Sequence, residues 1–286
     1  MRRIPSSILT ATILALTLAA CGGGDDAALA ATREEALSRI PAHKLPQCSL
    51  PAATAPLTAI TSLQGPGAAS PIVGQTVTVR GVVTADWRGS ERLNGFFIQQ
   101  PDPDHDPATS EGLFVFAPAD ATPLSVGDYV QIEGRVAEFR RTGELESLTQ
   151  IANPAALEVC GPTELIKPST LTLPLKDAAE LERVEGMLVR FNQPLVVSGN
   201  FTLGRFGELV LSPQSRLYHP NNHPELSPAA ARDLNARSRL VLDDVSSVQN
   251  PNPIPFLSDA GVEGTRRAGD VVRKLEGIMT WAFASY

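Results

Sequence analysis

The chain has 286 residues, of which 43% are hydrophobic, and this is enough for two domains of ordinary size. Its formal net charge is −7, a balance that argues against general binding of polyanions. The sequence contains 24 prolines and 22 glycines and has no long apolar stripe at helical spacing. This pattern is typical of an all-β chain with many turns.

The N-terminal segment has the pattern of a secretory signal. Arg2 and Arg3 precede an apolar run over residues 8–20, which is shorter than a comfortable membrane span. The run ends in Leu-Ala-Ala-Cys at 18–21, which resembles a bacterial lipobox, and this resemblance implies a lipid on Cys21. Asp does not follow Cys21, which in Gram-negative lipoproteins favours the outer membrane. We therefore expect a signal peptide over 1–20 and a lipid-anchored protein of the cell envelope, at the outer membrane or cell surface. An ordinary cleaved signal with an incidental cysteine is the alternative.

Residues 21–59 predict a flexible tether, with a short helix over 27–40. The Ala-, Pro-, Gly- and Ser-rich stretch over 51–74 predicts a linker that leads into the first folded unit. If Cys21 carries lipid, Cys48 and Cys160 remain as a pair in an oxidising compartment. These two cysteines flank the first unit, so a disulfide between them would tie its ends together. Two independent thiols are the alternative.

The first unit, over 60–160, predicts five strands, at 77–83, 95–100, 112–116, 128–139 and 145–151. Five short strands of this kind fit an oligonucleotide/oligosaccharide-binding (OB) barrel. A proline-punctuated connector begins at Asn153 and fills 161–180 between the two units.

The second unit, over 181–286, predicts strands at 186–191, 195–198, 207–211, 240–243 and 271–283, with a long polar insertion over 212–239. The phrase VGDYVQIEG at 126–134 recurs as AGDVVRKLEG at 268–277. Another strand follows the first phrase, but only residues 278–286 follow the second. We therefore expect a second OB-like barrel that is truncated. Its strand over 275–283, with Ile278, Met279, Trp281 and Phe283, would lack a closing neighbour and self-associate.

These blocks together resemble the amino-terminal region of large secreted bacterial nucleases of the endonuclease/exonuclease/phosphatase class. The likeness covers most of residues 60–286. The blocks that carry it are VTVRGVVTAD (77–86), GFFIQ (95–99), DPATSEGLFVF (106–116), VGDYVQIEGRVAEF (126–139), LTQI (148–151), LERVEGMLVR (181–190), GRFGELVLS (204–212) and LDDVSSVQNP (242–251).

In that family a catalytic domain follows the OB-like region, and its motifs are absent here. They are a Gln-Glu pair after a strand, a Gly-Asp-x-Asn loop and a Ser-Asp-His, whereas Ser258-Asp259 is followed by Ala260 in this chain. Hydrolysis of that type needs carboxylates for a divalent metal and a histidine. The resemblance therefore implies kinship with metal-dependent nucleases but no catalytic residue in this chain, and magnesium would belong to the missing nuclease domain.

The first barrel carries aromatic and basic residues that could contact single-stranded DNA. OB barrels stack bases on aromatic rings beside a basic groove. The candidates are Trp87, Arg88, Arg92, Phe97, Arg140 and Arg141. However, residues 75–151 contain six basic and twelve acidic side chains, a net of −6 that disfavours phosphate binding.

Asp102, Asp104 and Asp106 alternate in a loop, at a spacing that can converge on calcium. Pro107 and Leu113 stand where an EF-hand has glycine and glutamate, so only a loose calcium site or a solvated acidic loop remains. His219 and His223 flank a turn-forming Pro-Asn-Asn and are interpreted as surface residues.

The sequence therefore favours a non-catalytic nucleic-acid-binding or scaffold region of a secreted, lipid-anchored DNA nuclease. The expected partners are single-stranded DNA, the membrane through the lipid anchor, and either the missing nuclease domain or a second copy paired through the edge of the second barrel. The alternative is a free-standing OB lipoprotein of the cell surface that binds protein or polysaccharide. An enzyme in its own right is disfavoured because the catalytic motifs are missing.

Overall fold

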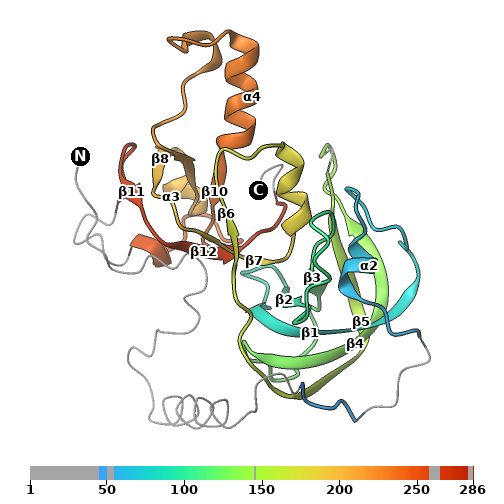
Figure 1. Ribbon diagram of the computed structural model, residues 1–286. Coiled ribbons are helices and arrows are strands. Elements are labelled where there is room, and N and C mark those ends of the chain that lie inside the picture. Colours follow the sequence, from blue (N-terminus) through green and yellow to red (C-terminus); the bar gives the residue numbers. More distant parts are fainter. Residues whose placement is uncertain (1–44, 50–54, 145, 258–264, 283–285) are drawn as a thin grey trace.

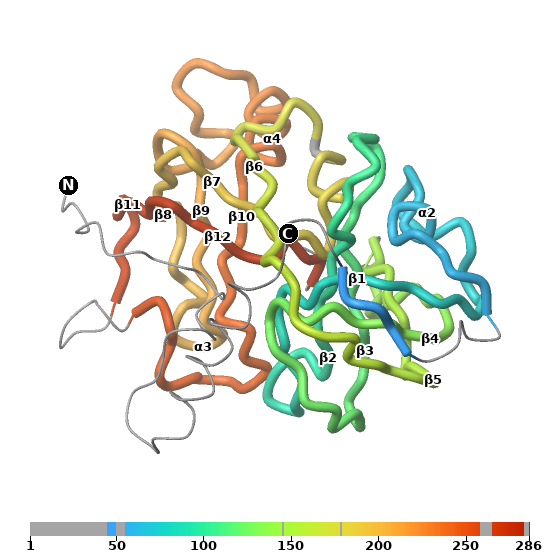
Figure 2. The backbone as a smooth tube through the Cα atoms, turned by 60° about the horizontal axis from the view of Figure 1, so that its bottom comes forward, coloured from blue at the N-terminus to red at the C-terminus, as the bar shows by residue number. Residues whose placement is uncertain are grey.

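The computed structural model describes residues 45–49, 55–144, 146–257, 265–282 and 286. The expected signal peptide, Cys21 and the helix expected over 27–40 lie outside these residues. Among the described residues, no helix is long and apolar enough to cross a membrane. Figures 1 and 2 show two units packed side by side, with the C-terminal end of the chain between them.

The first unit is a closed barrel of five strands. The strands are β1 (Thr76–Trp87), β2 (Gly95–Gln99), β3 (Gly112–Phe116), β4 (Asp128–Phe139) and β5 (Leu148–Pro162). They pair in the order β1-β2-β3-β5-β4, and β4 closes the ring by pairing with β1. All pairs are antiparallel except β3 with β5. The predicted all-β, OB-like fold class is thereby confirmed.

The interior of the barrel is filled by alternate residues of its strands, such as Phe96 and Ile98 of β2. A short helix, α2 (Ile60–Gln64), adds Ile60 and Leu63 to the same core, and both are fully buried. The linker predicted over 51–74 is therefore partly wrong. Two apolar residues three positions apart lie on one face of a helical turn, and this face packs on the barrel core.

Strand β5 is much longer than the predicted 145–151, because its ladder with β4 continues until Asp128 pairs with Pro162. The residues after Asn153, expected as connector, thus belong to the barrel. Beyond residue 152, β5 has β4 as its only strand neighbour among the described residues, and such edge positions tolerate proline. The extension brings Cys160 to Cys48, and the predicted disulfide is present.

The second unit consists of two small sheets. Its strands are β6 (Ser169–Leu171), β7 (Leu188–Phe191), β8 (Leu195–Gly199), β9 (Leu209–Pro213), β10 (Leu240–Leu242), β11 (Val271–Val272) and β12 (Leu275–Ile278). One sheet has the order β10-β9-β8-β11 and the other β12-β7-β6. If β7 and β8 count as one bent strand and β11 and β12 as another, this order repeats β3-β2-β1-β4 of the barrel. Strand β6 adds to this unit by pairing in parallel with β7. Among the described residues the strands of the unit do not close into a ring, so it is an incomplete barrel of the same kind.

Short helices connect the strands of the second unit. They are η2 (Ala178–Glu180), η3 (Glu182–Val184), α3 (Leu203–Phe206), η4 (Pro220–Asn222), α4 (Pro228–Ser238) and η5 (Pro255–Leu257). Helix α4 lies in the segment predicted as a polar insertion and projects away from the sheets of the second unit (Figure 1). The sequence contains a typical helix start, a serine followed by a proline at 227–228. In the structure the Ser227 hydroxyl accepts a hydrogen bond from the Ala230 amide at 3.3 Å, and Pro228 lies in the first turn.

Candidate functional site

The outer face of β1, β2 and β3 is the face with which OB barrels bind oligonucleotides and oligosaccharides. Here it carries a cluster of aromatic rings from Trp87, Phe97 and Phe114. The pairing of β1 with β2 shifts between Val83 and Ala85, a bulge that reverses which β1 side chains point outward. As a result Trp87 lies on the outer face although Val83, four residues earlier, lies in the barrel core.

The three rings pack on one another. The centroids of Trp87 and Phe97 are 5.5 Å apart with the rings nearly perpendicular, and those of Phe97 and Phe114 are 4.8 Å apart. Gly95 pairs with both Trp87 and Phe116 in the sheet. A Cβ at Gly95 would lie 2.4 Å from the tip of the Phe114 ring, so only glycine leaves space for this ring.

The second unit covers this aromatic face. Val245 belongs to the same buried cluster, and Ile278 of β12 packs against it. In the neighbouring loop, the Ser247 amide donates to the Glu91 carbonyl at 2.9 Å, and the Ser247 hydroxyl donates to the Ser90 carbonyl at 3.0 Å. Trp87 is consequently only 4% exposed and Phe97 is fully buried. The prediction that these two rings stack on bases is therefore wrong for this structure.

Arg88 also has a role inside the protein. Its guanidinium forms an ion pair with Asp86 at 2.7 Å and donates to the Thr122 carbonyl at 2.8 Å. A second carboxylate, that of Asp120, lies 3.5 Å away. With its donors directed at these groups, Arg88 fixes the loop before β4 and is not positioned to bind a phosphate.

The other three predicted arginines are exposed. Arg92 lies in the loop between β1 and β2, and Arg140 and Arg141 lie in the loop between β4 and β5. No ion pair of Arg92 or Arg140 is found within the described part of the chain. These are the two loops that border the ligand face in OB barrels.

The three aspartates of the acidic loop do not form a calcium site. All three are exposed, and among the described residues their carboxylates do not converge to the distances that a metal ion requires. Instead, Asp104 accepts a hydrogen bond from the Asp106 amide and Asp106 accepts one from the Ala108 amide, both at 2.9 Å. The Asp106 amide is also the main cause that lowers the pKa of Asp104. The carboxylates of Asp104 and Asp106 thus stabilise turns of their own loop.

The two units also meet at a very close backbone contact. A Cβ at Gly112 of β3 would lie 2.1 Å from the carbonyl carbon of Gly186, so the two backbones touch where both residues lack side chains. The Ser110 hydroxyl donates to the Glu185 carbonyl at 2.6 Å, and the Leu188 amide donates to the Gln99 side chain at 2.9 Å. The units are therefore joined both at this backbone contact and at the aromatic face.

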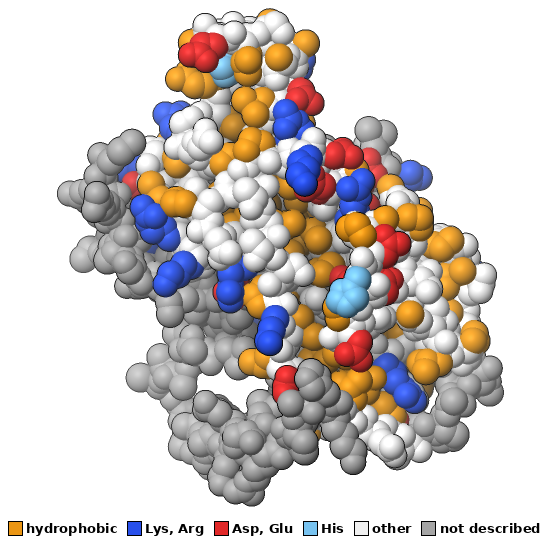
Figure 3. All heavy atoms as spheres, viewed as in Figure 1, with side chains coloured by type: hydrophobic (Ala, Val, Ile, Leu, Met, Phe, Trp, Pro, Cys, Tyr) orange, Lys and Arg blue, Asp and Glu red, His pale blue; other side chains and the backbone are white. Residues whose placement is uncertain are grey.

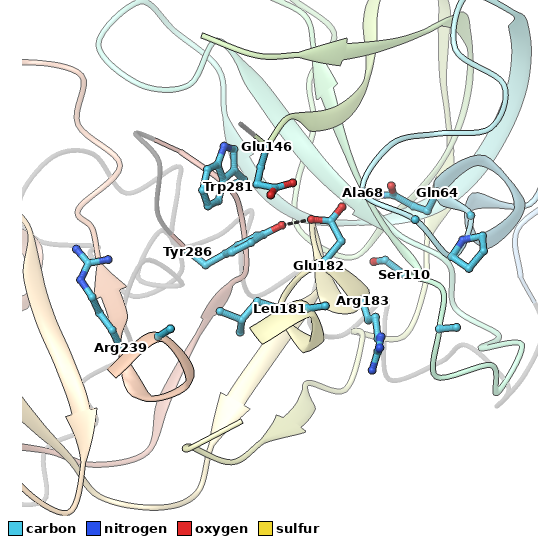
Figure 4. Close-up of a pocket in the computed structure, with 16 residues that line it drawn as sticks. Gln64, Ala68, Ser110, Glu146, Leu181, Glu182, Arg183, Arg239, Trp281 and Tyr286 are labelled. Carbon is cyan, nitrogen blue, oxygen red and sulfur yellow. Dashed lines mark hydrogen bonds between the residues drawn. The ribbon is translucent and has the colours of Figure 1, made fainter. Parts of the chain in front are cut away.

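A cavity of about 490 Å³ lies beside this contact, between the two units (Figure 4). Its lining includes Gln64 and Ser110 from the first unit, Glu146 from the loop before β5, and Glu182, Arg239, Trp281 and Tyr286 from the second. Figure 4 shows the carboxylates of Glu146 and Glu182 facing the same space, while the guanidinium of Arg183 points away from them. No motif in the sequence marks this cavity, because its residues come from six separate segments.

The cavity lining carries the carboxylates of Glu146 and Glu182 and the guanidinium groups of Arg183 and Arg239, and a third carboxylate, that of Glu185, lies beside it. The Tyr286 hydroxyl donates a hydrogen bond to Glu182 and lies 3.4 Å from a carboxylate oxygen of Glu185. Glu185 is only 1% exposed, and its other oxygen accepts from the Thr149 amide at 3.1 Å. Burial raises the pKa of Glu185 well above its ordinary value, and the neighbouring Glu182 raises it further. Burial likewise raises the pKa of Glu182.

The edge predicted to self-associate is mostly covered. Ile278 packs on the barrel, Met279 is 4% exposed and Trp281 lines the cavity, while Phe283 lies outside the described residues. Self-association through these three side chains is therefore not supported. The two histidines are surface residues, as interpreted: His219 caps η4, and His223 accepts hydrogen bonds from the Glu225 and Leu226 amides.

Charge differs between the two units. Residues 161–286 contain 13 basic and 14 acidic side chains, a net of −1, against −6 for residues 75–151. Figure 3 shows Lys and Arg side chains gathered mainly over the second unit on the face in view. A polyanion would therefore be repelled less by the second unit than by the barrel.

No family model and no curated protein matches this chain. Among solved structures it is similar to two aspartyl-tRNA synthetases, from Leishmania major Friedlin (14% identity, TM-score 0.28) and Entamoeba histolytica (18% identity, TM-score 0.26). These alignments cover 46% and 50% of this chain but only 24% and 27% of the synthetases. It is also similar to OBody AM2EP06, in a structure bound to hen egg-white lysozyme, with 20% identity and a TM-score of 0.23 over 32% of this chain and 84% of that one. Likenesses this weak support no assignment of function.

Proposed function

We propose that this chain is the non-catalytic scaffold region of a secreted, lipid-anchored nuclease, and that it contacts single-stranded nucleic acid through loop arginines. The blocks of sequence that resemble the nuclease family support the first part, as does an OB barrel stapled by a disulfide, which fits an oxidising compartment. The missing nuclease motifs support a role without catalysis.

The observation that carries the proposal is the division of the barrel surface into a covered face and exposed loops. The ring face is buried under Val245 and Ile278, so the barrel uses it to hold the second unit. Arg92 and Arg140 remain exposed in the two loops that border this face. Contact with nucleic acid is therefore electrostatic and independent of sequence, and the acidic surroundings keep it weak.

A salt titration of a labelled single-stranded oligonucleotide tests this proposal. Loss of two phosphate contacts in the double variant Arg92→Ala/Arg140→Ala should reduce the slope of log K against log salt by about 1.4. Arg232→Ala is the matched control, because Arg232 is an exposed arginine on α4, away from these loops. An unchanged slope in the double variant, or no binding at low salt, would refute the nucleic-acid role.

A glycan- or protein-binding role is the second candidate, and the cavity between the units favours it. The cavity combines aromatic rings, carboxylates and hydroxyls, a lining that suits a small polar ligand. If the oligonucleotide does not bind, the same titration with soluble polysaccharides, followed by the fluorescence of Trp281, tests this candidate.

A further inference from the structure

At the contact between the two units, two glutamates share one hydroxyl group as hydrogen-bond donor. If both glutamates were ionised, one of the two carboxylates would lack this donor. Glu182 and Glu185 both face the single hydroxyl of Tyr286. A phenol hydroxyl has one hydrogen, so it can donate to only one of the two carboxylates. The donation goes to Glu182, and the Glu185 oxygen that lies 3.4 Å from the hydroxyl then needs a proton of its own.

Among the described residues, no positively charged group lies against Glu185 to replace this proton. Glu182 on its own segment and Glu138 on β4 both raise its pKa, and Glu146 of the barrel acts in the same direction on Glu182. The uncharged groups that face Glu185 are the Thr149 amide and the Tyr286 hydroxyl. Arg183 is paired with Asp177 at 3.6 Å, and Arg239 lies on the other side of the Tyr286 ring (Figure 4).

We propose that Glu185 is protonated in the docked structure and acts as a proton-dependent latch between the barrel and the second unit. One carboxyl oxygen accepts from the Thr149 amide of β5, and the protonated oxygen donates to the Tyr286 hydroxyl, which donates in turn to Glu182. The latch joins β5 of the barrel to the end of the described chain. Its loss on deprotonation leaves two carboxylates facing one hydroxyl in a buried interface.

The direction of the pH effect follows from the raised pKa. A carboxyl group whose pKa is higher in the folded state than in the unfolded state stabilises the fold fully below its ordinary pKa, about 4.3 for glutamate. This stabilisation is lost as the pH rises through the raised value. Docking of the second unit therefore weakens with rising pH, and the aromatic face that includes Trp87 becomes more accessible. This inference stands on the interface alone and does not depend on nucleic-acid binding.

The first experiment compares the wild type with Glu185→Gln, whose amide can make the same hydrogen bonds without a charge. Between pH ~5 and ~8, the Tm of the wild type should fall by at least ~3 °C more than that of Glu185→Gln. The difference isolates Glu185, because all other acidic groups titrate in both proteins. Glu164→Gln is the control, since Glu164 is exposed, and it should follow the wild type. Equal pH dependence in the wild type and Glu185→Gln would overturn the proposal.

Two further measurements report on the latch directly. In protein labelled with ¹³C at the glutamate carboxyl, one resonance of the wild type should titrate clearly above the ordinary glutamate range, and it should vanish in Glu185→Gln. Acrylamide quenching of Trp87, measured in Trp281→Phe to remove the only other tryptophan, should increase with pH over the same range. If every glutamate of the wild type titrates in the ordinary range, the latch does not exist, whether or not the variant folds.

Discussion

Replacement of Gly112 by alanine should separate the two units, because the contact between them leaves no space for a single methyl group. The new Cβ would lie 2.1 Å from the carbonyl carbon of Gly186 and 2.4 Å from the amide nitrogen of Met187. Both are backbone atoms, so no side-chain rotation relieves the overlap. Overpacking of this kind costs about 1–3 kcal/mol.

To relieve this overlap, the backbones at Gly112 and Gly186 must move apart. This movement would also break the two hydrogen bonds that flank the contact, from the Ser110 hydroxyl to the Glu185 carbonyl and from the Leu188 amide to the Gln99 side chain. Each contributes about 1 kcal/mol. We therefore expect a total loss of roughly 3–5 kcal/mol, which corresponds to a fall in Tm of about 6–20 °C for a protein of this size. Calorimetry at fixed pH measures this fall.

Gly67→Ala is the matched control, because no atom lies within 4 Å of a Cβ at this position and its backbone is not left-handed. Its Tm should stay within about 2 °C of the wild type, since an alanine in open space has little effect. If Gly112→Ala is as stable as Gly67→Ala, the close contact of the two backbones does not exist in solution.

Three further predictions concern the core, the disulfide and a second acidic group. Trp87→Ala should destabilise the protein by about 3–5 kcal/mol, as for a buried aromatic ring, and a variant that is as stable as the wild type would contradict the burial of Trp87. The double variant Cys48→Ser/Cys160→Ser should lower the free energy of unfolding by roughly 4–5 kcal/mol, because the disulfide closes a loop with a sequence separation of 112. An unchanged midpoint of unfolding in urea would refute this prediction. Burial raises the pKa of Asp243 to about 7, so its contribution to stability should be present below pH ~4 and lost as the pH rises through about 7. Asp243→Asn should therefore flatten the fall in Tm over this range, and an identical pH profile would show that Asp243 titrates normally.

The sequence predicts the bounds of a strand correctly where neighbouring residues alone determine them. The predicted bounds of β3 and β4 match the structure, because alternating apolar residues are bounded there by turn residues at Gly112 and Asp128. The repeated Gly-Asp phrase correctly indicated a second, incomplete barrel. Strand β5 was predicted too short because prolines at 154 and 162 are typical of connectors, and only its pairing with β4 shows that they lie on an edge.

The candidate site was harder to predict, because it depends on contacts between distant segments. Trp87 and Phe97 were chosen for their chemistry, but the bulge in β1 and the cover supplied by Val245 and Ile278 decide that both are buried. Neither feature has a local signal. Glu185 was not singled out either, since a glutamate beside a glycine is unremarkable until Thr149 and Tyr286 lie against it.

The covering of the aromatic face by the second unit is tested most directly by NMR in solution. Nuclear Overhauser effects between the methyl groups of Val245 and Ile278 and the ring protons of Trp87, Phe97 and Phe114 report on this contact alone. Cross-peaks between the rings of Phe97 and Phe114, whose centroids are 4.8 Å apart, serve as the internal control for a folded barrel. We expect both sets of cross-peaks at low pH, where Glu185 is protonated and the latch is closed. Ring-to-ring cross-peaks without any from Val245 or Ile278 would show that the face is open and would contradict the docking of the two units.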